Sequence, residues 1–277
     1  MPWVKTNDLE IYYEDYGSGD PIIVLHGGLS DHQVWAEQLQ PLSDSFRFLP
    51  IDLRGHGKTG GTDQDRYTID TYVTDLRAVI DELALDKPVV LGHSFGGMIG
   101  YLFAKEYPDR LSALITVGGA TPQTFSKREW LIRYGVPKVI TPVISNERIM
   151  NGIIWVQTKV FSDEETGDVD EIERIRESHD CDVPDLAANE RPKIFRAILD
   201  YLSTNPSWDF QETPILMMYG ENEPMVNNHA DFLETALSAC HSVEIPDASH
   251  NAQVDNPEFI RHELRDFLGD KGYSNPG

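Results

Sequence analysis

The pentapeptide Gly92-His93-Ser94-Phe95-Gly96 constrains the fold of this chain more than any other stretch. It follows the aliphatic run 89–91 and precedes the apolar residues of 98–104, so it predicts a strand, a sharp turn and a helix. The two glycines let the strand and the helix pass closely on either side of the serine. Such a turn lifts the Ser94 hydroxyl to a helix N-terminus, where N–H groups and the helix dipole stabilise negative charge. The pattern is typical of a nucleophilic serine; the alternative is a glycine-rich turn with an incidental serine.

Two further glycine-rich segments follow predicted strands. The apolar run 22–25 fits a strand buried on both faces, and it ends in His26-Gly27-Gly28. Backbone N–H groups at such a glycine pair can point into a cleft, so the N–H groups of Gly28 and Phe95 are predicted to form an oxyanion hole. The next predicted strand, 47–53, leads into the polar loop Asp52-Leu53-Arg54-Gly55-His56-Gly57.

The order of these three strand ends resembles the α/β-hydrolase superfamily. The chain is most similar to esterase, lactonase and perhydrolase-like members that carry a helical cap. The resemblance covers nearly the whole chain and implies an α/β fold, with a mostly parallel central sheet, helices on both faces and an inserted cap. Its motifs are specific for the superfamily and its chemistry, but not for a substrate.

The middle of the chain has a different pattern. No buried strand is expected between Thr121 and Pro206, where amphipathic segments occur at 127–134, 147–160, 170–177 and 192–202. We therefore predict a core domain made of residues 1–120 and 207–277, with a helical cap at 121–206. Five apolar residues of this cap either line the substrate or form the cap's own core: Phe125, Trp130, Ile154, Trp155 and Phe161.

The remaining catalytic candidates lie near the C-terminus. The resemblance places a carboxylate three residues past the glycine that ends the strand 214–220, and Glu223 stands there instead of the usual Asp. Glu221 and Asp247 are the competing acids. His250 follows the predicted strand 242–245 and precedes the predicted helix 257–268, where the resemblance places the general base. The order Ser94, Glu223, His250 matches that of α/β-hydrolase triads.

These residues predict a serine hydrolase that cleaves a small carboxylic ester or lactone through an acyl-enzyme intermediate. Serine at the elbow argues against haloalkane dehalogenases and epoxide hydrolases, whose members carry Asp there. A carbon–carbon bond hydrolase, a perhydrolase and a ligand receptor with slow turnover remain alternatives. No metal or organic cofactor is expected.

The composition indicates which partners and which cellular compartment suit the protein. Its 46 acidic and 23 basic residues give a net charge of −23, which should repel nucleic acid and anionic membranes. The sequence contains no apolar run long enough for a membrane span, and its N-terminus lacks the layout of a signal peptide. Its two cysteines lie far apart, which suits a reducing compartment. We expect a cytoplasmic monomer or homodimer that acts on small molecules.

The acidic residues are spread along the chain, which suggests either salt adaptation or an ordinary acidic protein. If the protein is salt-adapted, added ions screen the repulsion between its carboxylates, and the melting temperature rises between low and molar KCl. A thermal melt at increasing KCl concentration measures this. Unchanged stability over that range would contradict salt adaptation.

Overall fold

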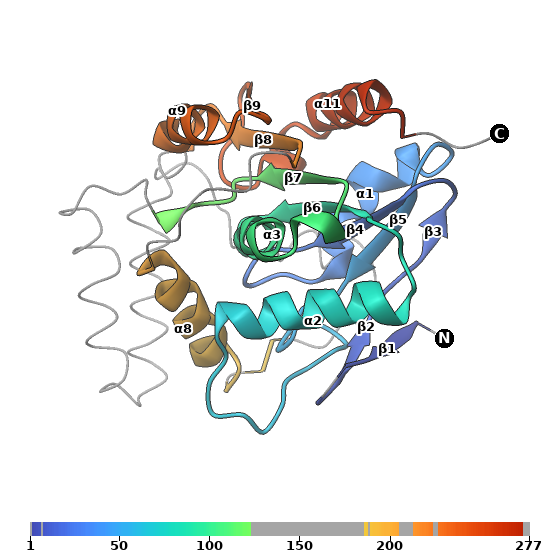
Figure 1. The fold of residues 1–277 in the computed structure, drawn as a ribbon. Helices are drawn as coiled ribbons and strands as arrows, with labels where there is room; N and C mark the ends of the chain where they lie inside the picture. Colours follow the sequence, from blue (N-terminus) through green and yellow to red (C-terminus); the bar gives the residue numbers. More distant parts are fainter. Residues whose placement is uncertain are drawn as a thin grey trace.

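The protein is described here by a computed structural model that covers residues 2–6, 8–122, 186, 187, 189–204, 213–223 and 227–273. Its main sheet has seven strands in the order β3-β5-β4-β6-β7-β8-β9, and only β3 is antiparallel to its neighbour (Figure 1). These strands are β3 Tyr16–Gly17, β4 Pro21–Leu25, β5 Arg47–Ile51, β6 Val89–His93, β7 Ala113–Val117, β8 Ile215–Gly220 and β9 Cys240–Ile245.

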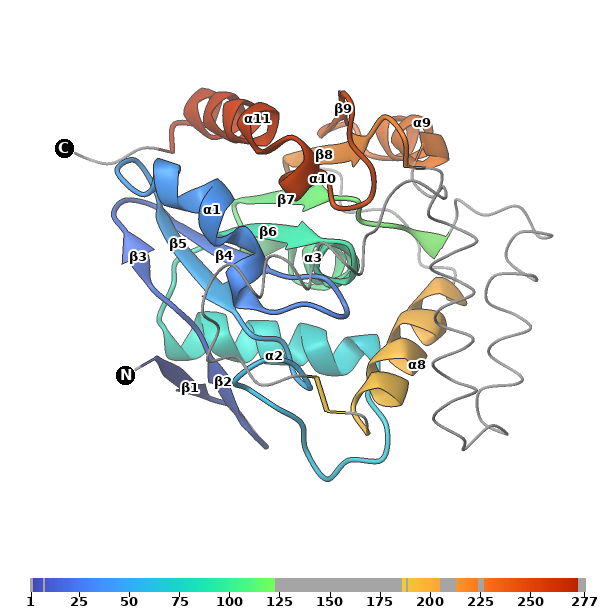
Figure 2. The ribbon, with the colours of Figure 1, turned by 180° about the vertical axis from the view of Figure 1, so that it is seen from behind.

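Helices cover both faces of this sheet, as Figures 1 and 2 show from opposite sides. The apolar residues of the strands alternate between the faces: along β4, Ile23 and Leu25 face one core, and Ile22 and Val24 face the other. The first core is covered by α2 Ile69–Glu82, α3 Phe95–Glu106, α8 Arg191–Leu202 and α9 Asn227–Ala236. The second is covered by α1 Ala36–Leu39, α10 Ala252–Asp255, α11 Pro257–Asp270 and the short 3₁₀ turns His32–Trp35 and Gln40–Leu42. The predicted mostly parallel α/β architecture is thereby confirmed.

Helix α2 illustrates how local sequence and packing agree. The Thr68 hydroxyl accepts a hydrogen bond from the Thr71 N–H, and the Thr71 side chain bonds back to Thr68, which satisfies donors that the first turn leaves free. Tyr72, Val73 and Leu76 recur on one face and are buried against the first core. The sequence predicts this helix through Leu85, but it ends at Glu82.

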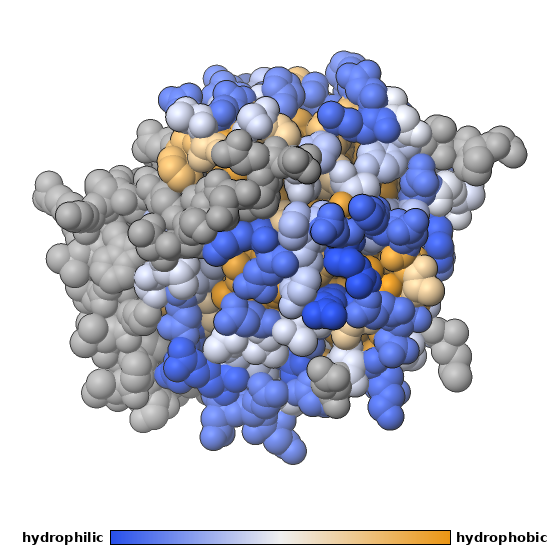
Figure 3. All heavy atoms as spheres, viewed as in Figure 1, coloured by the Kyte–Doolittle hydropathy of each residue, from blue (hydrophilic) through white to orange (hydrophobic). Residues whose placement is uncertain are grey.

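The structure differs from the sequence-based prediction at the N-terminal edge. The alternating, tyrosine-rich stretch 9–16 predicts an edge strand or hairpin arm. Instead, β2 Glu10–Tyr12 pairs with β1 Trp3–Lys5 in a separate two-stranded sheet, while β3 joins the main sheet. Polar residues account for most of the coloured surface in Figure 3, with apolar residues visible between them. Within the described ranges, the helices are too short or too polar to span a bilayer.

The predicted cap is described only in part. Helix α8 confirms the amphipathic segment predicted at 192–202, and it packs against α2 (Figure 1). The segments at 127–134, 147–160 and 170–177 lie outside the described residues, as do the five apolar candidates between Phe125 and Phe161. The division into a core and a cap therefore stays a prediction.

Candidate active site

Ser94 lies on the sharp turn between β6 and α3, as the sequence predicts. Its backbone has φ 49° and ψ −110°, a conformation that costs energy for a residue with a side chain. A Cβ on Gly92 would lie 2.5 Å from the backbone of Gly96, and a Cβ on Gly96 would lie 2.5 Å from the carbonyl oxygen of Leu25. Only glycine at both positions lets the strand and the helix approach this closely, so the glycines allow the sharp turn that carries Ser94.

Three side chains from separate loops meet at this turn. The Ser94 Oγ lies 2.9 Å from Nε2 of His250, and Nδ1 of His250 lies 2.5 Å from Oε1 of Glu223. With Nδ1–H donating to the carboxylate, Nε2 is left to accept the serine proton. Glu223 is 1% exposed, so the charge beside the imidazole is shielded from water. The geometry is that of a nucleophile, a base and an orienting acid.

The loops after β8 and β9 bring the acid to the histidine. The N–H of Glu221 bonds to the carbonyl of Ile245, and the N–H of Asn222 bonds to that of Ala248, which ties the two loops together. Glu221 itself is exposed, and its carboxylate accepts a hydrogen bond from the backbone N–H of Asp247. Asp247 is also exposed. Of the three candidate acids, the structure brings only Glu223 to His250.

Gly28 and Phe95, the predicted oxyanion residues, lie side by side. A Cβ on Gly28 would be 3.6 Å from the Cβ of Phe95. Phe95 is the first residue of α3, so its N–H has no partner within the helix. On the Gly28 side, His26 Nδ1 donates to the carbonyl of Gly27 at 2.7 Å, and His26 Nε2 accepts from the N–H of Leu53. Because a trans peptide holds its C=O and N–H in opposite directions, this bond turns the Gly28 N–H away from His26.

Burial supports the protonation state that this arrangement needs. Desolvation, reinforced by the neighbouring His56, lowers the pKa of His26 to about 3, so the ring is neutral and keeps one proton, on Nδ1. His56 contacts the next carbonyl, with Nε2 2.8 Å from the oxygen of Gly28. The two histidines therefore brace consecutive peptides of the loop that carries the predicted oxyanion donor.

The acidic and basic residues of the Asp52–Gly57 loop also act as braces. Asp52 accepts hydrogen bonds from the backbone N–H and Nδ1 of His32 and from the N–H of Lys58. Burial alone would disfavour a charged His32, but its bonds to Asp52 and Glu14 raise its pKa to about 9. Arg54 is also buried and forms ion pairs with Asp75 and Asp8.

His93, inside the elbow, points away from the nucleophile, as its place in the motif predicts. Its Nε2 lies 3.0 Å from the backbone oxygen of His250, and the two rings lie 5.2 Å apart between centroids. Burial and the neighbouring His250 lower the pKa of His93 to about 3. A neutral His93 thus holds the backbone of the loop that presents His250.

Sequence reasoning missed the contribution of α8. Ile198 and Ile194 of this helix lie directly over Gly28, 3.0 Å and 3.9 Å from the position that a Cβ there would occupy. Their amphipathic spacing was visible in the sequence, but the surface against which they pack was not. Across the described ranges, no group of three or more His, Cys, Asp or Glu residues is arranged to hold a metal ion.

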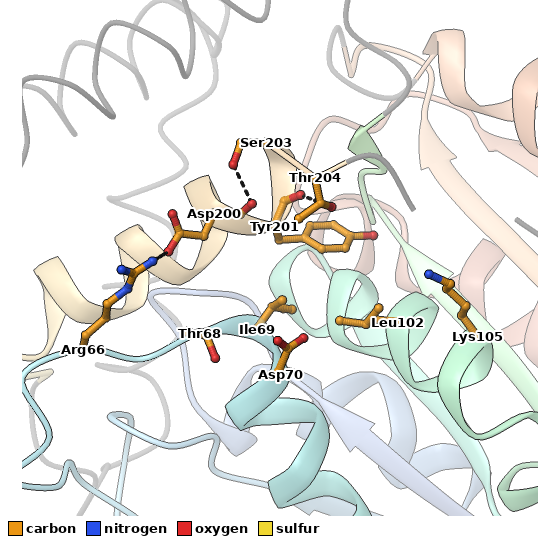
Figure 4. Close-up of a pocket in the computed structure, with 10 residues that line it drawn as sticks. All are labelled: Arg66, Thr68, Ile69, Asp70, Leu102, Lys105, Asp200, Tyr201, Ser203 and Thr204. Carbon is orange, nitrogen blue, oxygen red and sulfur yellow. Dashed lines mark hydrogen bonds and ion pairs between the residues drawn. The ribbon is translucent and has the colours of Figure 1, made fainter. Parts of the chain in front are cut away.

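A cavity of about 390 Å³ lies at the C-terminal end of α8, between α2 and α3 (Figure 4). None of the triad residues lines it. In Figure 4 the Tyr201 ring extends from α8 toward Leu102, and Arg66 pairs with Asp200 at the rim. This cavity is therefore separate from the reacting groups.

Known proteins are similar to this chain in sequence and in fold. The family model for the alpha/beta hydrolase fold matches residues 20–145. Human "Epoxide hydrolase 4" is 24% identical over 296 residues, which cover 96% of this chain and 77% of that protein. The structure of a thermophilic esterase from Thermogutta terrifontis is 25% identical with a TM-score of 0.73, covering 97% of this chain and 98% of that one.

An enol-lactonase from Burkholderia xenovorans has the same fold, with 20% identity, a TM-score of 0.72 and coverage of 97% of this chain and 100% of that chain. These similarities agree with the strand order, the elbow between β6 and α3, and the loops that follow β8 and β9. The chain therefore has the α/β-hydrolase fold, and known hydrolases are similar to it over nearly its whole length.

Proposed function

We propose that this hydrolase cleaves a small carboxylic ester or lactone through an acyl-enzyme intermediate on Ser94. The observation that carries the proposal is the chain of contacts from Ser94 Oγ to His250 Nε2 and from His250 Nδ1 to Glu223 Oε1. The similarity to an esterase and an enol-lactonase supports the same class of bond.

The reaction follows from these positions. His250 Nε2 takes the proton of Ser94 as Oγ attacks the acyl carbon, and Glu223 stabilises the imidazolium that forms. The N–H groups of Gly28 and Phe95 bind the negatively charged oxygen of the tetrahedral intermediate, each lowering the barrier by about 3 kcal/mol. His250 then gives the proton to the leaving oxygen. A water molecule, deprotonated by His250, attacks the acyl-enzyme and releases the acid.

Epoxide opening is disfavoured by the nucleophile, although an epoxide hydrolase is among the relatives. A carboxylate that opens an epoxide forms an ester, which water can cleave. Ser94 would form an ether, which has no carbonyl for water to attack, so the enzyme would stop after one turnover. The serine therefore supports acyl transfer.

A substrate panel tests the proposal. We expect steady-state release of the carboxylic acid from p-nitrophenyl acetate or from a small lactone, and no sustained opening of styrene oxide. A single burst of nitrophenol without steady state would instead support a receptor with slow turnover. Faster cleavage of a β-diketone, or peracid formation from peroxide and a carboxylic acid, would favour the carbon–carbon bond hydrolase or the perhydrolase. The p-nitrophenol absorbance and product chromatography distinguish these outcomes.

A further inference from the structure

Helix α8 places an apolar surface against the predicted oxyanion hole. A Cβ on Gly28 would lie 3.0 Å from Cδ1 of Ile198, 3.6 Å from Cβ of Phe95 and 3.9 Å from Cγ2 of Ile194. The Ile198 side chain therefore occupies the space above Gly28 that a larger residue at that position would fill. Ile194 is 1% exposed, and Ile198 is partly buried against the same core.

We propose that Ile198, backed by Ile194, forms the acyl-side wall of the active site and limits the enzyme to short, uncharged acyl groups. This inference rests on the proposed ester or lactone hydrolysis and specifies which substrates that site accepts. Glu190, just before α8, is paired with Tyr67 and Lys193. Among the described residues other than its chain neighbours, the side chains nearest to the Cβ position at Gly28 are the apolar ones of Ile198, Ile194 and Phe95, all within 4 Å.

The sheet topology assigns this wall to the acyl side. Strand β6 lies between β4 and β7, so Ser94 has the β4 end on one side and the β7 end on the other. His250 lies on the β7 side, because a Cβ on Gly118, which directly follows β7, would lie 3.3 Å from Nδ1 of His250. The leaving group must lie within reach of His250 to receive its proton. The acyl chain then extends to the β4 side, where Gly28 and Ile198 meet.

A buried polar clamp sets the position of α8. Glu190 is 3% exposed, and its Oε2 accepts a hydrogen bond from the Tyr67 hydroxyl at 2.5 Å. Its Oε1 accepts from Nζ of Lys193 at 2.9 Å, and the same ammonium group donates to the carbonyl of Thr62. These bonds join the start of α8 to the loop that precedes α2.

The absence of a side chain at Gly61 makes room for this clamp. A Cβ there would lie 2.1 Å from Cδ of Glu190, well inside contact distance. At the other end of the helix, Asp200 pairs with Arg66, as Figure 4 shows. Bonds at both ends of α8 join it to the loop that precedes α2, and these bonds hold Ile198 in its position above Gly28. Glu190 is thus a positioning residue, since it touches no reacting atom.

The test compares the hydrolysis of p-nitrophenyl acetate and p-nitrophenyl octanoate. The wild type should favour acetate, and Ile198→Ala should raise the ratio of kcat/KM for octanoate to that for acetate by about 10-fold, because a deeper apolar pocket binds additional methylene groups. Ile198→Val is a milder change, and its octanoate-to-acetate ratio should lie between those of the wild type and Ile198→Ala. The matched control is Arg196→Ala, since residue 196 lies about 200° around the helix from residue 198; its ratio should equal that of the wild type.

Glu190 is tested by the same ratio. Glu190→Gln keeps an oxygen that accepts from Tyr67, whereas Glu190→Ala loses both contacts, so the octanoate-to-acetate ratio should rise in Glu190→Ala and recover in Glu190→Gln. A purely structural role would lower activity on both esters equally and leave the ratio unchanged, which would overturn the positioning role of Glu190.

The outcomes separate this inference from the proposed function. If folded Ile198→Val and Ile198→Ala keep the wild-type ratio while hydrolysis depends on Ser94, the acyl-wall assignment is wrong and the hydrolase proposal stands. If the wild type cleaves neither ester nor any lactone, the hydrolase proposal fails. A wild type that prefers octanoate would overturn the acyl wall alone.

Discussion

Replacing Ser94 by alanine should lower kcat for ester hydrolysis by roughly 10³-fold or more while the protein stays folded. In the proposed mechanism the change removes the atom that attacks the substrate, and His250 and Glu223 cannot replace it because the members of such a triad act as a unit. The fold should survive because only one half-buried hydroxyl is lost. Serine and alanine both carry a Cβ, so the positive φ at residue 94 costs about the same in either protein. Steady-state kinetics and a thermal melt measure the two effects.

Labelling gives an independent check on Ser94. A serine-directed phosphonate should modify Ser94 alone in the wild type, and mass spectrometry of the digested protein should find no label in Ser94→Ala. The matched control is Ser43→Ala, which removes an exposed hydroxyl bonded to the backbone oxygen of Gln40; its activity and labelling should equal those of the wild type. Activity that survives Ser94→Ala would end the serine-hydrolase interpretation.

Replacing Glu223 by glutamine should lower kcat by about 10²- to 10⁴-fold. Glutamine retains the size of the side chain and an oxygen that can accept from Nδ1 of His250, but it removes the charge that stabilises the imidazolium in the proposed mechanism. Because Glu223 is buried, water cannot replace that charge. Kinetics on p-nitrophenyl acetate measure the loss, with circular dichroism to confirm that the variant is folded.

Two neighbouring acids provide the controls for Glu223. Glu221→Gln should cost little, because this side chain is exposed and its contact is to the backbone of Asp247. Asp247→Asn should also lower kcat only slightly. Glu223→Asp should retain partial activity, since it keeps the charge but shortens the reach to His250 by one methylene. If Glu223→Gln were near wild type while a folded Glu221→Gln or Asp247→Asn were inactive, the acid would be misassigned.

Much of the fold was readable from local patterns. The alternation of apolar residues along the buried strands and the capped, amphipathic helix that begins at Ile69 predicted their elements with small errors at the ends. The short strands β1 to β3 were harder, because two or three residues carry almost no periodic signal. Their pairing depends on which distant segment supplies a partner.

The sequence by itself determined the elbow at Ser94, the glycines that permit its backbone, and the order of Ser94, Glu223 and His250 along the chain. These are local properties, since a tight turn needs glycine wherever it occurs. Only the tertiary structure decided that Glu223 reaches His250 while Glu221 faces solvent, and that Ile198 lies above Gly28. These contacts join residues that are far apart in the chain, and their geometry depends on strand order and helix packing, which no single segment specifies.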